Sequence, residues 1–366
     1  MDAVARAGKN GDDVEIPTVK VTMLGTTGSG KSTFMLGMYA TLSAGLRGYF
    51  VYAQDQDDHI DLTDAWDRLL DDGLLPPPTT EERSRRYEFV FTQGFDTLLN
   101  IDWLDYRGGA LTDRKTARDT AELQQRLGQS DSVYLVLDGN AVGRWVRSIV
   151  EGEGDNPSLR LERIQRELKV QDMTAQLNRC VGERRKAGLP APSVVALITK
   201  MDTLPVTSGL DRIDAINLAV EHLPELLPVV TSGLTTLVSP VQLGEFGTEH
   251  HDTVDTQRVN PTHLHKPFVF TLMQYLWSGI EDNETELENL AAADVAAATE
   301  LERLRSGVVR SLRNRGRINS LQSEKQRRRS AAESRRSTVN LMNSRVQQLR
   351  DELMNLPIYR NGKLAP

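Results

Sequence analysis

The residues with the clearest chemical pattern form one run, Gly25-Thr26-Thr27-Gly28-Ser29-Gly30-Lys31-Ser32, with the spacing G-x-x-x-x-G-K-S. Glycines in such a run let backbone N–H groups turn inward around a phosphate, and a helix that begins there directs its positive end at the same place. The pattern places the ammonium of Lys31 on the β- and γ-phosphates and the hydroxyl of Ser32 on Mg²⁺. The segment from Gly25 to Thr33 is therefore predicted to bind a nucleoside triphosphate.

A second run, Thr199-Lys200-Met201-Asp202, comes directly after the apolar residues 194–198. A carboxylate in this position can accept hydrogen bonds from the ring N–H and the amino group of guanine, and adenine cannot make these two bonds. A site built around such a contact rejects the wrong base, because the buried carboxylate would be left unpaired. The run predicts guanine as the base, with Thr199, Lys200 and Asp202 at the site.

A third run, Asp105-Tyr106-Arg107-Gly108, ends an apolar segment. Here Asp105 can hold Mg²⁺ through water, and the N–H of Gly108 can contact the γ-phosphate. Asp102 competes for the metal role, although the position of Asp105 at the end of the segment favours the latter. Arg107 is a candidate for stabilising charge in the transition state, and an ordinary surface arginine is an equally good interpretation.

Alternating strands and helices must position these runs. Short apolar segments predict strands at residues 19–24, 87–92, 98–104, 133–137, 194–199 and 235–238, and helices are predicted at 32–44, 111–127, 144–186, 211–227 and 267–277. Uninterrupted apolar strands between helices are typical of a parallel sheet that is covered on both faces. The predicted fold is the three-layer α/β/α sandwich of P-loop NTPases, with a mainly parallel sheet.

Together, the three runs in this order, each after a strand, resemble the TRAFAC class of GTPases, and more narrowly the bacterial double-GTPase type. The resemblance covers roughly residues 17–280. It implies a threonine before the second strand that closes on Mg²⁺ and the γ-phosphate, for which Thr79 and Thr80 both match by position. It also implies a base-holding loop, for which Ser239 and Pro240 are the nearest match. The chain departs from the class at Gly109, where many Ras-like members have a glutamine that orients water.

Composition limits the class of protein. The chain has 366 residues, 39% of them hydrophobic, and a net charge of −7. Its single cysteine excludes an intramolecular disulfide and a cysteine-rich zinc cluster. The start of the sequence is polar and lacks a secretory signal, and no apolar run approaches the 20 or so residues that a membrane span needs. We therefore expect a soluble, cytoplasmic protein without a transmembrane segment.

The charge is unevenly distributed along the chain. Residues 301–350 contain 14 Lys and Arg against 3 Asp and Glu, so the rest of the chain is acidic. This asymmetry predicts a flexible arm at 1–16, a GTPase-like domain at 17–280 with an acidic insert at 55–75 and a helical insert at 140–190, and a basic helical extension at 281–366. The extension shows no strand pattern. It carries a coiled-coil stripe of Val339, Met342, Val346, Leu349, Leu353 and Leu356.

These predictions combine into a function. We expect a Mg²⁺-dependent switch that binds GTP and hydrolyses it to GDP and phosphate, slowly without help, and that contacts a protein partner through its switch loops and C-terminal helices. The alternatives are a GTP-bound scaffold without hydrolysis and a P-loop ATPase. For the basic extension, nucleic-acid phosphate or an anionic membrane are less favoured ligands, since no aromatic residue lies between Trp277 and Tyr359 to stack on bases.

Overall fold

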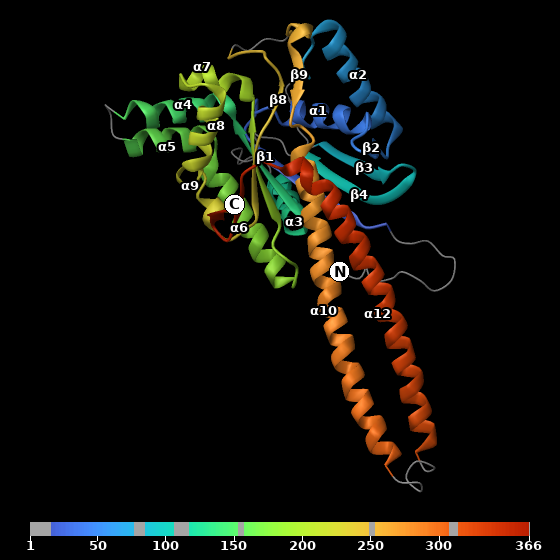
Figure 1. Cartoon of the computed structure of the whole chain (residues 1–366). Coiled ribbons are helices and arrows are strands. Elements are labelled where there is room, and N and C mark those ends of the chain that lie inside the picture. Colours follow the sequence, from blue (N-terminus) through green and yellow to red (C-terminus); the bar gives the residue numbers. More distant parts are fainter. Residues whose placement is uncertain are drawn as a thin grey trace. The chain divides into compact units, whose positions relative to one another are not determined.

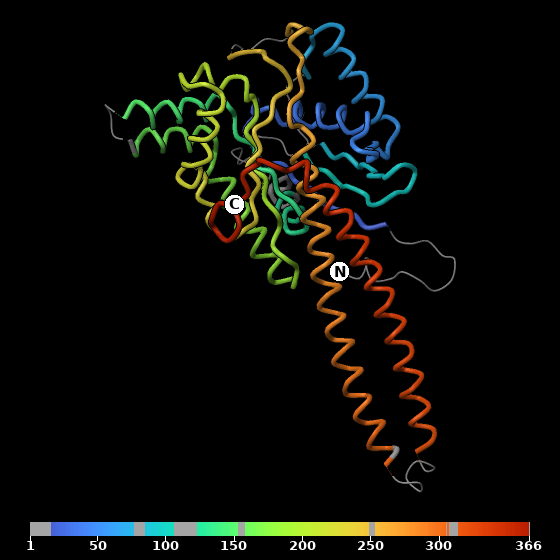
Figure 2. The backbone as a smooth tube through the Cα atoms, viewed as in Figure 1, coloured from blue at the N-terminus to red at the C-terminus, as the bar shows by residue number. Residues whose placement is uncertain are grey.

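The computed structural model describes residues 16–76, 85–105, 117–152, 157–248, 253–306 and 314–365, apart from the side chains of residues 117–122, 157 and 305. These residues form two compact units. One contains residues 16–272 and 353–365, and the other contains residues 273–352. Figure 1 labels their helices and several of their strands, and Figure 2 follows the backbone in the same view.

A nine-stranded sheet forms the centre of the first unit, in the order β11-β10-β7-β6-β5-β1-β4-β3-β2. Its strands are β1 (Thr18–Gly25), β2 (Tyr49–Ala53), β3 (Arg85–Gln93), β4 (Asp96–Asp105), β5 (Ser132–Asp138), β6 (Ser193–Thr199), β7 (Thr236–Pro240), β10 (Ile358–Arg360) and β11 (Lys363–Leu364). The five strands β4, β1, β5, β6 and β7 run parallel, and the strands at both edges are antiparallel. The predicted α/β fold with a mainly parallel sheet is thus confirmed. A separate pair, β8 (Gln242–Gly244) and β9 (Val259–Thr262), is antiparallel.

Helices cover both faces of this sheet. They are α1 (Lys31–Ser43), α2 (Gln56–Asp72), α3 (Ala117–Gln129), α4 (Gly139–Glu151), α5 (Pro157–Glu167), α6 (Val170–Lys186), α7 (Leu204–Ser208), α8 (Arg212–Glu221) and α9 (Leu223–Leu226), with the 3₁₀ turns η2 (Met201–Thr203), η3 (Pro228–Thr231), η4 (Thr256–Arg258) and η5 (Asp351–Leu353). Two long helices follow, α10 (Lys266–Arg305) and α12 (Arg315–Arg350).

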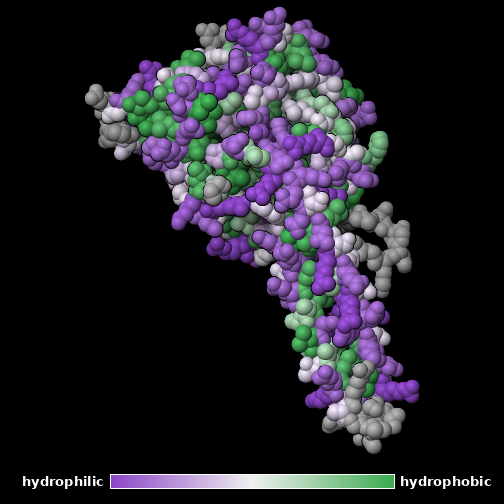
Figure 3. Space-filling model, viewed as in Figure 1, coloured by the Kyte–Doolittle hydropathy of each residue, from purple (hydrophilic) through white to green (hydrophobic). Residues whose placement is uncertain are grey.

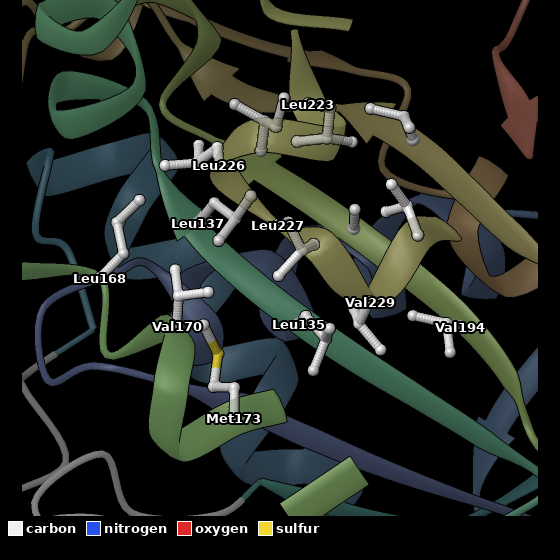
Figure 4. Packing of buried hydrophobic residues seen from close by; sticks show 14 of the residues in the cluster. Leu135, Leu137, Leu168, Val170, Met173, Val194, Leu223, Leu226, Leu227 and Val229 are labelled. Carbon is white, nitrogen blue, oxygen red and sulfur yellow. The ribbon is translucent and has the colours of Figure 1, made fainter. Parts of the chain in front are cut away.

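The alternation of side chains along β5 divides the core into two layers. Val133, Leu135 and Leu137 point to one face, where they join a large buried cluster with residues of α3, α4, α6, α8 and α9. Figure 4 shows part of this packing, including Leu168 and Met173 beside β5. This layer holds β5 and β6 in place and so fixes where these two strands end.

An aromatic cluster fills the opposite layer. Tyr134 of β5 lies against Phe34 of α1 and Trp103 of β4, with ring centroids 6.2 and 5.1 Å apart. Phe268, in the first turn of α10, stacks on Trp103 at 6.5 Å. The hydroxyl of Tyr134 is also hydrogen-bonded to that of Thr271 at 2.9 Å. The start of α10 therefore belongs to the core beside α1.

The end of the chain corrects one prediction. The sequence shows no strand pattern after Glu281, yet β10 pairs with β7 and β11 pairs with β10 at the edge of the main sheet. The side chain of Tyr359 is buried, and its hydroxyl donates to the carbonyl oxygen of Val220 at 2.7 Å. A strand of three residues is too short for its alternation to stand out beside the helical pattern that precedes it.

In the second unit, α12 packs antiparallel to α10. The part of the predicted stripe that lies in this unit is largely confirmed, because Val339, Val346 and Leu349 are buried and Met342 is half-buried. The stripe also extends toward the start of α12, where Ile318 and Leu321 form a small cluster with Leu301.

Between these two apolar ends, α12 makes several polar contacts with α10. Arg335 donates to Asn283 at 3.2 Å, and Arg328 donates to the carbonyl oxygen of Ala293 at 3.0 Å. Arg317 forms an ion pair with Glu300 at 3.4 Å. Polar side chains dominate the surface of both helices visible in Figure 3. The basic helix thus finds part of its counter-charge within its own unit.

Within the part of the chain that the structure describes, no helix is long and apolar enough to cross a membrane.

Candidate nucleotide site

The glycine-rich run forms a loop between the end of β1 and the start of α1. Gly28 and Gly30 adopt left-handed backbone angles, with φ of 77° and 83°, which favour glycine. Gly25 has no room for a side chain, because a Cβ there would lie 2.9 Å from the Cβ of Val136. Ser29 closes the turn by donating from its hydroxyl to the carbonyl oxygen of Thr26 at 2.8 Å. Thr33 lies in the first turn of α1.

Lys31 is the first residue of α1 and lies inside the loop. Its Nζ donates to the carbonyl oxygens of Thr26 at 2.8 Å and Gly25 at 3.2 Å, and only 7% of the residue is exposed. Burial lowers the pKa of this ammonium, and the nearby carboxylate of Asp105 acts in the opposite direction. A buried cation at the start of a helix is suited to holding phosphate oxygens.

Ser32 and Asp105 are brought together from two elements 73 residues apart. The hydroxyl of Ser32 donates to Oδ2 of Asp105 at 2.9 Å. Among the residues that the structure describes, the other oxygen, Oδ1, is buried and has no hydrogen-bond partner, and burial raises the pKa of this carboxyl. An unsatisfied buried carboxylate oxygen beside a hydroxyl suits a cation, so these residues fit Mg²⁺.

The composition of this pair also limits which metal fits. In the described part of the chain, no group of three or more His, Cys, Asp and Glu residues could hold a metal ion. Mg²⁺ in nucleotide sites is commonly bound by one or two protein oxygens, with phosphate and water completing its shell. The pair of Ser32 and Asp105 matches this arrangement.

Asp102, the competitor for the metal role, has other partners. Arg86 donates to both of its carboxylate oxygens, at 2.8 and 3.1 Å, and Arg126 donates to Oδ2 as well. Burial alone would raise the pKa of Asp102, but the hydrogen bonds from the two arginines outweigh it and leave the pKa lowered. The structure therefore brings Asp105 to Ser32 and places Asp102 in an ion pair that joins β3, β4 and α3.

Thr199 connects the glycine-rich loop to β6. Its buried hydroxyl donates to the carbonyl oxygen of Ser29 at 2.7 Å and lies 3.2 Å from that of Leu137. The next residue, Lys200, has a positive φ of 50° and forms an ion pair with Oδ2 of Asp138 at 2.6 Å. The ends of β5 and β6 are thus joined to each other and to the loop.

Asp202 is held by a loop that the sequence does not single out. Its Oδ2 accepts hydrogen bonds from the backbone N–H groups of Phe246 at 2.9 Å and Gly247 at 3.0 Å. Burial raises the pKa of this carboxyl, and the two amides act in the opposite direction. Ser239 and Pro240, predicted for the base-holding loop, are instead the last two residues of β7 and are buried there.

A cavity of about 910 Å³ opens at the outer edge of the glycine-rich loop. It is lined by residues 26–28, by Asp138 and Lys200, and by one side of α4 that includes Arg144 and Arg147. Lys31, Ser32, Asp105 and Asp202 do not line it. The cavity therefore lies beside the glycine-rich loop. We place the candidate chemistry at the side chains inside this loop and not in the cavity.

Four predicted residues cannot be placed. Thr79, Thr80, Arg107 and Gly108 lie outside the described residues. Of the remaining predictions, the structure brings Ser29, Lys31, Ser32, Asp105 and Thr199 into one connected set at the carboxyl ends of β1, β4 and β6. Ligands of open α/β sheets bind at such ends, where the strand order reverses, and here it reverses at β1.

A loop of this geometry at the reversal point of a mainly parallel sheet defines a P-loop-type α/β fold. No protein-family model matches the chain, and no curated protein matches it. Among solved structures, the chain is similar to the crystal structure of a dynein light intermediate chain's conserved domain. The identity is 14%, the match covers 62% of this chain and 68% of that one, and the TM-score is 0.28. A likeness of this size carries no conclusion about function.

Proposed function

We propose that this chain is a GTP-binding switch that hydrolyses GTP to GDP and phosphate with Mg²⁺. The observation that carries the proposal is the pairing of Ser32 with Asp105 beside Lys31. A buried ammonium, a hydroxyl and a carboxylate with one unsatisfied oxygen lie together at the start of α1. Triphosphate and Mg²⁺ would use all three groups, whereas a purely structural role leaves the unsatisfied oxygen unexplained.

Each group has a role in phosphate chemistry. The backbone N–H groups of residues 25–33 and the ammonium of Lys31 bind and orient the phosphates. Ser32 and Asp105 would hold Mg²⁺, which neutralises charge that develops on the phosphate oxygens. Hydrolysis is then an in-line attack of water on the γ-phosphate, and positioning supplies most of the rate enhancement.

The base is assigned through Asp202. Its position directly after β6 and the contact of Thr199 with the loop are the features that support guanine. A carboxylate with one oxygen toward the ring N–H and one toward the amino group distinguishes guanine from adenine. In this proposal Asp202 reads the base, and Thr199 holds the phosphate loop next to it.

Hydrolysis is expected to be slow without a partner. Gly109, which follows Gly108, has no side chain to orient water. Arg107 is a candidate to supply positive charge in the transition state, as an arginine finger does in other GTPases. Thr79 or Thr80 would close on Mg²⁺ and the γ-phosphate. The segments around these residues and the helices α10 and α12 are the surfaces we propose for a protein partner.

A second candidate, hydrolysis of ATP, is favoured by one observation. Asp202 already accepts two hydrogen bonds through Oδ2, from Phe246 and Gly247. A carboxylate whose role is to hold its own loop does not read a base, and the phosphate chemistry would be unchanged. The two candidates therefore differ only at Asp202.

The test is to identify the nucleotide that purified protein carries, by chromatography, and then to measure phosphate release over many turnovers with GTP and with ATP. We expect bound guanine nucleotide, together with phosphate release from GTP that Ser32→Ala strongly reduces. Bound adenine nucleotide would favour the ATPase. Tight GTP binding without phosphate release, even when cell lysate is added, would indicate a scaffold that does not hydrolyse GTP.

A further inference from the structure

The loop of residues 245–248 uses the part of Asp202 that a base would need. A carboxylate oxygen has two lone pairs in the plane of the group. At Oδ2 of Asp202, both are directed to the N–H groups of Phe246 and Gly247, at 2.9 and 3.0 Å. Reading guanine requires both carboxylate oxygens, one for the ring N–H and one for the amino group. The bonds seen here and full base recognition therefore compete for the same oxygen.

We infer that the loop of residues 245–248 competes with the nucleotide base for the carboxylate of Asp202. This competition sets which base the site accepts. A base opens the loop only if its own N–H groups replace the two bonds that Asp202 gives up. Guanine offers two such donors on adjacent positions, and adenine offers no matching pair, so adenine would leave the carboxylate unpaired. This inference rests on the proposed function, since it assumes that Asp202 reads guanine.

The surroundings of the loop allow a small and local opening. The N–H of Glu245 donates to the carbonyl oxygen of Arg258 at 3.0 Å, and its carboxylate pairs with Arg212 at 3.3 Å. Residue 245 is thus held at the end of the β8–β9 pair. Gly247 has a φ of 79°, and apart from its two chain neighbours no heavy atom of the described residues lies within 4 Å of the position of a Cβ there. Rotation of the backbone at residues 246 and 247 would release Asp202 without unfolding its neighbours.

Hydrogen exchange of individual amides tests the inference in the wild-type chain. Without nucleotide, the amides of Phe246 and Gly247 should exchange more slowly than free amides, because both are hydrogen-bonded to the half-buried carboxylate of Asp202. With saturating GDP and Mg²⁺, their exchange should accelerate at least tenfold, and an equal concentration of ADP should leave it unchanged. If GDP binds and both amides stay equally protected, the inference is overturned and the proposed function survives. If calorimetry detects no binding of either nucleotide, both fail.

A matched pair of variants provides a second readout. Gly247→Ala places a side chain in open space at a positive φ, which strains the closed loop and leaves Asp202 unaltered. Because this strain weakens the hydrogen bonds of the loop to Asp202, GDP binding should tighten by about fivefold, as expected for backbone strain at a single residue. The control is Gly233→Ala, at a φ of 89° and equally open space in a different loop. Equal GDP affinities of the two variants would overturn the inference.

Discussion

Replacing Thr199 with valine is expected to weaken nucleotide binding, although Thr199 touches no phosphate in this proposal. Its hydroxyl donates to the carbonyl oxygen of Ser29 at 2.7 Å. Because the peptide between Ser29 and Gly30 is planar and trans, this bond also turns the N–H of Gly30 away from Thr199. That N–H is one of those expected to face a phosphate. Thr199 is therefore a positioning residue for the loop.

The size of the effect follows from the burial of the hydrogen bond. Valine has nearly the shape of threonine and only 3% of Thr199 is exposed, so the substitution removes the hydroxyl and leaves the carbonyl oxygen of Ser29 without this donor. An unsatisfied buried group costs about 1–3 kcal/mol. If the loss falls on the phosphate-binding conformation of the loop, the Kd for GDP rises by roughly 5- to 150-fold.

Isothermal titration of GDP into the folded variant measures this change, with circular dichroism to confirm that the fold is intact. The matched control is Thr22→Val. Thr22 is also buried and hydrogen-bonded, but its hydroxyl bonds to that of Ser130 at 2.7 Å and not to the glycine-rich loop. Thr199→Ser, which keeps the hydroxyl, should restore most of the affinity. If Thr199→Val and Thr22→Val bind GDP equally well, Thr199 does not position the loop and the reasoning fails.

Other substitutions test the remaining parts of the site and the sheet. Lys31→Ala should reduce GTP affinity at least 100-fold with little change in fold, since a buried phosphate partner is lost. The control Lys20→Ala, which alters β1 outside the loop, should leave GTP affinity unchanged. Equal losses of affinity in the two variants would contradict the assignment of the glycine-rich loop to phosphate binding. Ser32→Ala should make nucleotide affinity nearly independent of Mg²⁺, and a titration against EDTA that matches the wild type would exclude Ser32 as a ligand. Asp202→Asn should shift preference from guanine toward xanthine nucleotides, because an amide donates where xanthine has a carbonyl; an unchanged ratio of GTP to XTP affinity would mean that Asp202 does not read the base. Tyr359→Phe should lower the midpoint of thermal unfolding by about 2–4 °C through loss of one buried hydrogen bond, and an unchanged midpoint would mean that β10 adds little to the stability of the sheet.

The features that could be predicted from the sequence share a simple signature. Several are polar residues at the end of an apolar strand, such as Asp105 at the end of β4 and Thr199 at the end of β6. An apolar run marks a buried strand, and the first polar residue marks where it leaves the core. The preference for Asp105 over Asp102 followed from the same reasoning, and the contact with Ser32 agrees with it.

The features that were missed have no such signature. The N–H groups of Phe246 and Gly247 belong to the backbone, and every residue except proline carries one, so no residue type reveals their role. The two strands after α12 are three and two residues long, too short to show alternation. The arginines of α12 were interpreted as a surface for a partner. Some of these arginines form ion pairs with Glu286, Asp294 and Glu300 of α10. The composition of residues 281–302 does not reveal which partners these carboxylates have.

This difference explains why the sequence indicates the residues of the proposed phosphate site more directly than the loop that contacts Asp202. Four parallel strands, β4, β1, β5 and β6, end at one edge of the sheet, so their final residues meet whatever their separation in sequence. In the proposed site, Gly25 and Asp105 lie at these ends beside the phosphates and Mg²⁺, and Thr199 holds the glycine-rich loop in position. In this proposal, base binding would depend on how Asp202, three residues beyond the end of β6, shares its Oδ2 with the loop between β8 and β9. In this proposal, the choice of base would depend on a contact between two segments that are 44 residues apart and that share no strand end.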